Sequence, residues 1–446
     1  MSTKLARIAE IARERTEERF TTLAHLLDEE MLKQCHAELK KGKALGIDQV
    51  SKEEYDANLE TNISDLVARL KRKAYRPQPV RRVYIPKPGT DKKRPLGIPA
   101  YEDKIVQAGL SKILNAIYEA DFLDCSWGFR PNRSCHDALK VLNFIIETKK
   151  VNYLVDADIK SFFDNVDHEW LMKFLGHRIN DPSIHRLIRR ILKVGYMEEG
   201  RKYIAESGTP QGGVISPILA NVYLHYVLDL WFQKVIKAKS KGEAYLVRSA
   251  DDFVCCFQYK EDAESFYREL QARLEKFNLS IATEKTKIIE FGRFAAENRE
   301  RKGKGKPDTF DFLGFTHYCS NSEAGKFRVK RKTSRKKFKA KLAKMKEWIR
   351  GSRTTLVWEF VDKLREKLLG HYQYYGVTDN IRMLIRYQYE VNRLLYKWLN
   401  RRSQRKSFTW EKFNLFLKKC NFPRPKINVN IYEFKLRYSY IKLMMS

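Results

Sequence analysis

The chain has 446 residues, enough for about two to four domains of ordinary size. It carries 87 Lys and Arg residues against 55 Asp and Glu residues, a formal net charge of +32, which favours a polyanionic partner such as nucleic acid. No apolar run reaches membrane-spanning length, and the first residues mix arginine with glutamate, which fits neither a signal nor a transit peptide. Seven cysteines without C-x-x-C spacing argue against a zinc ribbon and are typical of a reduced, cytoplasmic protein.

The N-terminal hundred residues are expected to form helix and then a hairpin. Residues 4–40 have the periodicity of a polar helical segment. The glycine-punctuated stretch KALGIDQVS then begins a new unit near residue 44. Residues 76–99 hold several prolines around the strand candidate VRRVYIP, which predicts a hairpin with a basic tip from Lys87 to Arg94.

Strand and helix signals alternate from residue 150 onwards, which predicts an α+β fold. A strand is expected at 153–159 (YLVDADI), followed by helices at 168–179 and 181–196. The segment YLVRSADDFVCCFQY at 245–259 predicts a hairpin that turns near SADD, and a helix follows from Glu261 to Phe277. KIIEFG and TFDFLGFTHY predict edge strands, and the charged stretch 293–309 between them predicts a loop.

After about residue 330 the chain is expected to be helical and, at first, strongly basic. Residues 326–350 contain thirteen Lys and Arg residues and one acid, Glu347. Their apolar members have helical spacing, which leaves the cations on the opposite face. The alternative to RNA contact is a solvated charged face, but the one-sided charge favours RNA. The residues expected to contact RNA are Lys330, Arg331, Lys332, Arg335, Lys336, Lys337, Lys339 and Lys341.

Three acids at two expected strand ends are the candidates for chemistry. Asp158 lies near the end of the strand YLVDADI, and Asp251 and Asp252 occupy the turn between two apolar strands. Burying such charges is unfavourable unless a cation compensates them. Two magnesium ions about 4 Å apart, held by two or three carboxylates, can activate a hydroxyl and stabilise a leaving pyrophosphate. For the Asp251–Asp252 pair taken alone, the alternative is an ordinary polar turn.

Eight segments in order resemble successive blocks of group II intron reverse transcriptases: LGIDQVS, KRPLGIPAYEDKIVQ, GFRPNRSCHDAL, DADIKSFFDNVDH, GTPQGGVISPILANVYL, RSADDFV, EKTKI and FDFLGFTH. GHYQYYG at 370–376 and LLYKWLNRRSQRKSFTW at 394–410 are similar to the maturase domain X of that family. The resemblance implies a right-hand polymerase fold. An N-terminal helical extension would span residues 1–43. Fingers and palm, with an antiparallel sheet, would span 44–320, and an α-helical thumb/maturase domain 321–446.

The same resemblance implies a two-metal centre that uses Mg²⁺, with Mn²⁺ as a substitute. Its ligands would be Asp158, Asp251, Asp252 and the carbonyl of Ile159. Asp156 shares a strand face with Asp158, and composition alone leaves the choice between them open. The pattern D-I-K-x-F-F-D favours Asp158.

For the incoming deoxynucleoside triphosphate, the implied contacts are Lys87, Arg94, Phe163, Gln211, Gly212 and Lys285. Phe163 would lie under the sugar and exclude a 2′-hydroxyl, whereas the alternative for this ring is simple core packing. Lys285 would neutralise the leaving pyrophosphate. Leu313 and Gly314 resemble the primer-grip region, and Arg130 is expected to be structural or to face the template.

The implied partners are intron RNA, an RNA template, a DNA primer and deoxynucleoside triphosphates, with no membrane and with a homodimer left open. The family usually has Tyr-Ala-Asp-Asp where this chain has Ser249-Ala250-Asp251-Asp252, so the aromatic ring beside the primer end is missing. Neither a His-Asn-His endonuclease nor a ribonuclease H domain is recognised in the sequence. Three functions therefore compete: a reverse transcriptase that also assists splicing, an RNA-binding splicing cofactor with an impaired polymerase, and a reverse transcriptase recruited to defence or DNA repair.

Overall fold

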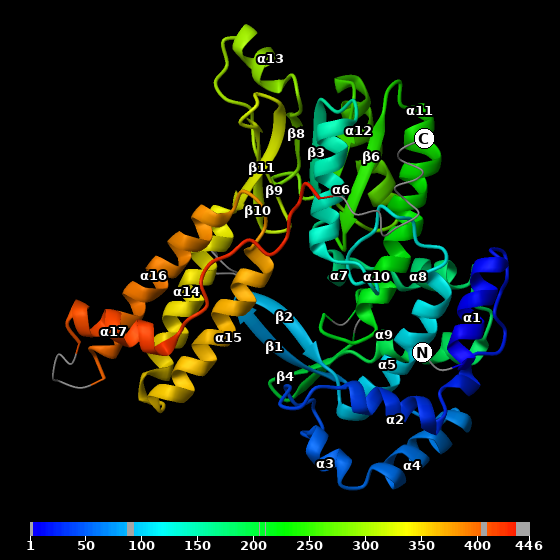
Figure 1. Ribbon diagram of the computed structural model, residues 1–446. Coiled ribbons are helices and arrows are strands. Elements are labelled where there is room, and N and C mark those ends of the chain that lie inside the picture. Colours follow the sequence, from blue (N-terminus) through cyan, green and yellow to red (C-terminus); the bar gives the residue numbers. More distant parts are fainter. Residues whose placement is uncertain (1–2, 87–92, 205, 210, 403–407, 434–446) are drawn as a thin grey trace.

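A four-stranded antiparallel sheet with the order β6-β7-β3-β8 carries the candidate acids (Figure 1). Its strands are β3 (Tyr153–Asp158), β6 (Ala244–Ser249), β7 (Asp252–Phe257) and β8 (Lys287–Glu290). The computed structural model describes residues 3–86, 93–204, 206–209, 211–402 and 408–433. Within these ranges helices and antiparallel sheets are mixed, which confirms the expected α+β class.

The two faces of this sheet belong to two different hydrophobic cores, because successive side chains on a strand point to opposite faces. Val155, Phe253 and Cys255 are buried in the first core. It also takes in α5 (Tyr101–Tyr118), α8 (His168–Leu175), α10 (Ser216–Leu224) and α12 (Lys260–Lys276). Leu154 and Val254 are buried in the second core, which joins α6 (Cys135–Thr148) to the C-terminal elements.

The N-terminal segment is helical but interrupted. Residues 4–40 divide into α1 (Thr3–Glu14), a 3-10 turn η1 (Ala24–Leu26) and α2 (Glu29–Glu38). Asp28 determines where α2 begins, because it caps this helix by accepting a hydrogen bond from the Met31 amide at 3.0 Å. Helices α3 (Lys52–Asp56) and α4 (Leu59–Lys71) follow before the first strand.

A second sheet has the order β2-β1-β4-β5. The expected hairpin is present as β1 (Val80–Pro86) and β2 (Lys93–Ile98), and β4 (Tyr196–Glu198) pairs in parallel with β1 and antiparallel with β5 (Arg201–Tyr203). The helix expected at 181–196 is therefore too long, since α9 ends earlier (Pro182–Lys193). Gly195 has a positive φ of 76°, and a Cβ there would lie 1.9 Å from the carbonyl oxygen of Tyr203.

The C-terminal part begins with strands rather than helices. β9 (Phe310–Phe312), β10 (Phe315–Asn321) and β11 (Phe327–Thr333) form a third antiparallel sheet. The expectation of helix from residue 330 is thus wrong for 330–333, where Val329, Arg331 and Thr333 alternate as buried residues of a strand. The expected loop at 293–309 also contains a short helix, α13 (Ala295–Arg301).

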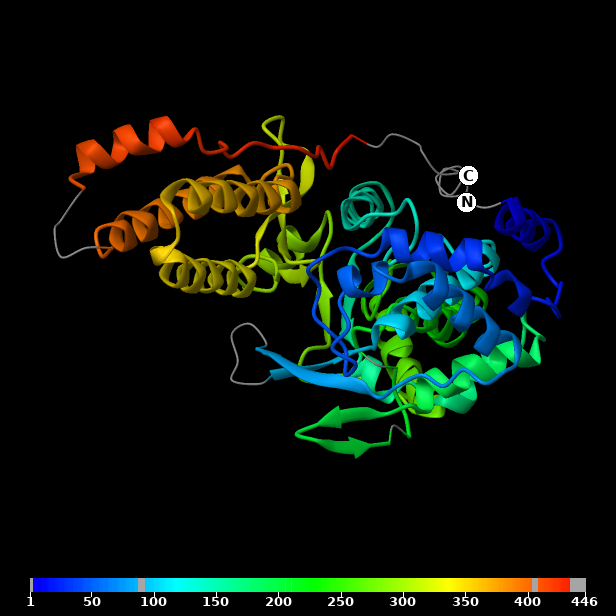
Figure 2. The same cartoon turned by 90° about the horizontal axis from the view of Figure 1, so that it is seen from below.

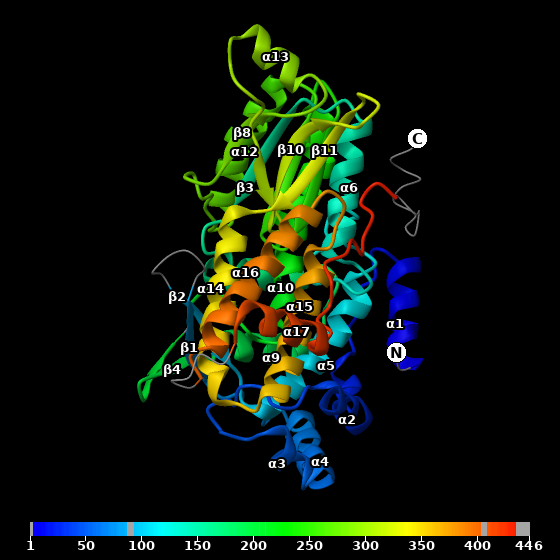
Figure 3. The same ribbon diagram turned by 60° about the vertical axis from the view of Figure 1, so that its left-hand side comes forward.

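Four helices complete the described C-terminal part: α14 (Arg335–Gly351), α15 (Val357–Tyr375), α16 (Ile381–Leu399) and α17 (Trp410–Cys420). Seen from below, they stand to one side of the rest of the molecule, and the β1–β2 hairpin extends toward them (Figure 2). Turned toward the viewer, α14, α15 and α16 run along one another below the β10–β11 hairpin (Figure 3). No helix in the described ranges is long and apolar enough to cross a membrane.

Candidate active site

The strand register brings together the acids that the sequence singled out. Asp158 at the end of β3 lies directly opposite Asp252 at the start of β7. Asp251 lies in the short connection between β6 and β7, where Ala250 adopts a left-handed conformation with φ of 59°. Three carboxylates therefore lie at neighbouring strand ends at one end of the sheet.

Their electrostatics indicate an excess of negative charge. Burial raises the pKa of Asp252 to about 7, and the charges of Asp156 and Asp251 add to the effect. Burial also raises the pKa of Asp156 to about 7, together with the charges of Asp311 and Asp158. A cation bound among these groups would relieve the repulsion.

Two basic side chains, Lys285 and Arg94, interact with these carboxylates. Lys285 forms an ion pair with the Asp158 carboxylate, and this hydrogen bond raises the pKa of the ammonium group. Burial and the charge of Asp158 raise the pKa of Asp251, whereas Arg94 on β2 opposes them. Lys87 lies outside the described residues, so its expected contact with the triphosphate is without a structural account.

The donor set fits magnesium in kind, because Mg²⁺ prefers carboxylate and carbonyl oxygens and keeps several waters. The raised pKa of Asp252 also favours a cation at this place, because the protein itself does little to stabilise the charged carboxylate. Among the described residues, however, no group of three His, Cys, Asp or Glu side chains is already arranged as a metal site. The Asp158 carboxylate is instead paired with the ammonium group of Lys285.

The described residues of the GTPQGG segment contact α7 (Phe162–Asn165) and strand β2. The amide of Thr209 donates to the carbonyl of Phe163 at 2.8 Å, and the Gln211 side chain donates to Asp164 at 3.2 Å. The Gly97 amide of β2 donates to the Gln211 carbonyl at 2.7 Å. A Cβ at Gly212, whose φ is 105°, would lie 2.9 Å from the Gly97 oxygen, so only glycine allows this close approach.

These contacts bring the Phe163 backbone, Gln211 and Gly212 together with Gly97 of β2. Phe163 belongs to the short helix α7 (Phe162–Asn165); its ring is half-buried and packs edge-on against Phe162 with centroids 5.3 Å apart. A cavity of about 430 Å³ next to it is lined by residues of β1, β2, β4 and the GTPQGG segment, including Pro95, Gly97, Asp164 and Gln211.

The sequence reading missed Arg248, which holds the acidic turn from behind. This arginine is fully buried in β6 and donates to Asp229, which lies in the π-helical turn η2 (His225–Asp229) after α10. It also donates to the Ala250 carbonyl at 3.0 Å, inside the turn itself. The available signal was a single cation in the otherwise apolar strand AYLVRS.

The turn between β9 and β10 contacts the acids from the other side. The Leu313 amide hydrogen bonds to Asp252 and partly counteracts the rise in its pKa. Tyr374 of α15 donates to the Leu313 carbonyl at 2.9 Å, which links this turn to the C-terminal helices. Tyr372 and Tyr375 are buried in the second core, which favours core packing over base stacking for these rings.

Most of the cations expected to contact RNA are exposed, with one correction. The exposed ones are Lys332 on β11 and Arg335, Lys336, Lys337, Lys339 and Lys341 on α14. Lys330 is half-buried. Arg331 is fully buried and donates to Asn143 of α6 and, at 2.5 Å, to the Val329 carbonyl, so the expectation of RNA contact is wrong for this residue.

Arg130 is also buried; it donates to Glu119 and to the carbonyls of Leu123 and Ser126, which is a structural role.

Comparison with known proteins adds a family assignment to this geometry. A model of the family "reverse transcriptase (RNA-dependent DNA polymerase)" matches residues 85–317. The group II intron-encoded protein LtrA of Lactococcus lactis subsp. cremoris is 41% identical over 231 residues, which cover 51% of this chain and 38% of LtrA.

Two further relatives extend this picture. Protein YkfC of Escherichia coli (strain K12) is 32% identical over 315 residues, 64% of this chain and 78% of YkfC. An uncharacterized 91 kDa protein in the cob intron of Schizosaccharomyces pombe is 37% identical over 200 residues, 45% of this chain and 24% of that protein. The chain thus spans only part of LtrA and of the fission yeast protein.

Proposed function

This chain belongs to the reverse transcriptase family, among the group II intron-encoded proteins and intron maturases, and from this premise we propose that it copies RNA into DNA and binds its intron RNA. The observation that carries the proposal is the pairing of Asp158 with Asp252 beside Asp251. Neighbouring strand ends that carry Asp158, Asp251 and Asp252 support a site at which these carboxylates would act together on bound metal ions.

Two Mg²⁺ ions would be held by Asp158, Asp251, Asp252 and the carbonyl of Ile159. When bound, they would supply activation of the primer 3′-hydroxyl and neutralisation of the leaving pyrophosphate. The rest of the work falls to the protein. Arg94 orients the triphosphate by charge, as basic side chains do in phosphoryl transfer generally. Lys285 would have to leave Asp158 before this carboxylate could bind a metal ion. Its ammonium group would then be free to donate a hydrogen bond to a phosphate oxygen.

Selection of the nucleotide follows from the packing around α7. The Phe163 ring would sit beneath the sugar and leave no room for a 2′-hydroxyl, so deoxynucleotides are preferred. The GTPQGG segment brings a glycine-lined backbone close to the base pair that forms. Its fixed position against Gly97 of β2 supports a role for Gln211 and Gly212 at the incoming nucleotide.

The right-hand arrangement is part of the proposal. The β1–β2 and β4–β5 hairpins would be the fingers, the sheet of β3, β6, β7 and β8 the palm, and helices α14 to α16 the thumb. An N-terminal extension would occupy residues 1–43. The expected boundary between residues 320 and 321 cuts through the β10–β11 hairpin, so we begin the thumb at Ser334, which caps α14 by accepting from the Lys337 amide.

Binding of intron RNA and assistance to splicing would use the exposed cations of α14. A splicing cofactor with an impaired polymerase is the second candidate, and the observation that favours it is Ser249 in the position of the usual tyrosine. A primer-extension assay separates the two functions. The wild-type protein, an RNA template, a DNA primer, Mg²⁺ and deoxynucleotides should yield extended product, whereas Asp251→Asn should reduce extension by several orders of magnitude and keep RNA binding. Wild-type protein that binds RNA without extending the primer would favour the cofactor.

A further inference from the structure

Helix α9 is amphipathic in an unusual sense, because its polar face is almost entirely cationic. Its apolar face buries Ile184, Leu187, Ile188, Ile191 and Leu192 in the first core. The other face carries Arg186, Arg189, Arg190 and Lys193, and His185 lies beside them. This charge is not used by the proposed active site, because none of these residues belongs to the strands or loops that hold the acids.

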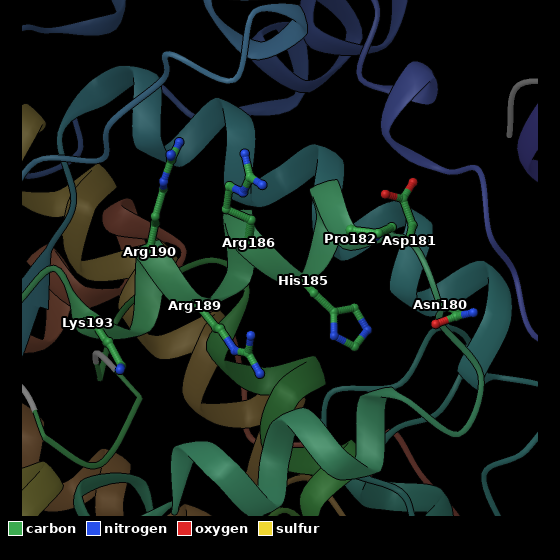
Figure 4. A pocket seen from close by; sticks show the side chains of 8 residues that line it. All are labelled: Asn180, Asp181, Pro182, His185, Arg186, Arg189, Arg190 and Lys193. Atoms are coloured by element: carbon green, nitrogen blue, oxygen red, sulfur yellow. The ribbon is translucent and has the colours of Figure 1, made fainter.

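The cationic side chains line an open groove of about 660 Å³ together with Asn180, Asp181 and Pro182. Arg186 and Arg190 point to one side of the helix, whereas His185, Arg189 and Lys193 point to the other (Figure 4). Each row repeats every four residues, or about 6 Å along the helix axis. The cations are thus presented as two rows along the helix (Figure 4).

The positive charge of the groove is not paired with acidic side chains in the described part of the chain. None of the four basic residues forms an ion pair there, and Arg190 donates only to the carbonyls of Lys73 and Tyr75. Burial lowers the pKa of Arg190, and the neighbouring charges of Arg76 and Arg186 lower it further, which is the signature of crowded like charges.

Among the described residues, Asp181 forms no ion pair with the cations of the groove. Its two carboxylate oxygens accept four backbone hydrogen bonds, from Leu23 and Ala24 on one oxygen and from Ser183 and Ile184 on the other. The carboxylate therefore serves the first turn of α9 and fixes the helix against the N-terminal segment. The four cations of the groove thus face a single carboxylate, so the groove keeps a net positive charge that favours an anionic ligand.

We propose that the α9 groove binds the phosphate backbone of RNA at a surface separate from the active site. Arginine presents a planar fork of donors that matches phosphate oxygens, and three of the four cations are arginines. A membrane surface would require apolar side chains beside the cations, whereas those of α9 are buried. The inference rests on the proposed function only in that the chain handles RNA.

The test is the salt dependence of RNA binding by the full chain carrying Arg186→Ala, Arg189→Ala and Lys193→Ala together. Arg190 is left intact because of its backbone contacts. The slope of log affinity against log salt for a long double-stranded RNA should fall by about 2 to 3, since each lost phosphate contact removes about 0.7 to 0.9. A matched control neutralises three exposed cations outside the α9 groove and should keep the slope. These are Arg301, Lys304 and Lys306.

The outcomes separate this inference from the proposed function. Extension of a short primer–template by the wild-type protein reports the active site, and its failure would count against the polymerase alone. An unchanged salt slope in the triple variant, with an unchanged Tm, would overturn the α9 groove as an RNA site. Loss of binding to phosphatidylserine vesicles with RNA binding intact would also overturn it, in favour of a membrane surface. Retention of the slope by Arg186→Lys with Arg189→Lys would support a charge contact.

Discussion

Arg248 donates two hydrogen bonds to Asp229, 2.7 and 2.6 Å long, and neither side chain is exposed to solvent. The remaining N–H groups of the arginine reach Asn221, Ser126 and the Ala250 carbonyl. Every donor of this buried guanidinium is thus satisfied, and one of them fixes the backbone of the turn that carries Asp251 and Asp252. The π-helical turn η2 and the acidic turn are held as one unit.

Breaking this pair should destabilise the protein strongly. Arg248→Met leaves Asp229 buried and unpaired, which typically costs about 3–5 kcal/mol. The expected result is a clear drop in the free energy of unfolding, measured by urea denaturation. The double variant Arg248→Met with Asp229→Leu should recover part of that stability but not primer extension, because the Ala250 carbonyl still lacks its donor. A double variant that regained full extension would show that the turn does not depend on Arg248.

Because Lys285 forms an ion pair with Asp158, it would compete with a bound Mg²⁺ for that carboxylate. Lys285→Ala removes the competing ammonium group, so the Mg²⁺ concentration for half-maximal extension should fall. The maximal extension rate should also fall, because a cation near the leaving pyrophosphate is lost. Titration of Mg²⁺ at saturating nucleotide measures both quantities. The exposed Lys304, which forms no ion pair with the acids, provides a matched control as Lys304→Ala. A half-maximal concentration that rose would contradict the competition.

The carboxyl cluster should make metal-free stability depend on pH. The pKa values of Asp156 and Asp252 are raised to about 7, so the folded protein holds protons that the unfolded chain releases near pH 4. The free energy of unfolding without divalent cations should therefore fall as the pH rises from about 4 to about 7. Asp156→Asn should flatten this dependence. Equal slopes in the variant and the wild-type protein would mean that the repulsion is relieved in another way.

The ring of Phe163 should set the preference for deoxynucleotides. Phe163→Val opens space at the edge of the GTPQGG segment, so ribonucleotides should be incorporated more readily relative to deoxynucleotides. Single-nucleotide extension with each type of triphosphate measures the ratio. Phe162, buried in the core beside it, is the control position, and Phe162→Val should lower stability without changing the ratio. An unchanged ratio in Phe163→Val would assign that ring to core packing.

Ser249 lies opposite Asp252 in the β6–β7 register and covers far less apolar area than the usual tyrosine. Stacking or packing by such a ring is worth ~1–3 kcal/mol. Ser249→Tyr should therefore raise the extension rate or processivity, by up to ~10–100-fold. Comparison on one primer–template at equal occupancy measures the change. A slower tyrosine variant would mean that the neighbouring side chains have adapted to serine.

Several parts of the site could be predicted from the sequence because they depend on local patterns. Apolar runs on both sides of SADD predict a hairpin and place Asp251 and Asp252 at its turn, and the apolar run of YLVDADI places Asp158 near the end of a strand. Residues 76–99 predict a hairpin for a similar local reason, since prolines and β-branched residues limit the alternatives. These signals need no knowledge of distant residues.

The tertiary structure alone decided which strands pair and which charges are buried. Asp158 meets Asp252 only because β3 pairs with β7 across almost a hundred residues, and no local pattern encodes that register. Arg331 looks like its neighbouring cations in the sequence, yet the strand β11 turns it inward to Asn143 of α6. Side-chain direction alternates along a strand but follows a 3.6-residue period along a helix. Which cations of the same run are buried and which are exposed therefore depends on whether tertiary packing makes the segment a strand or a helix.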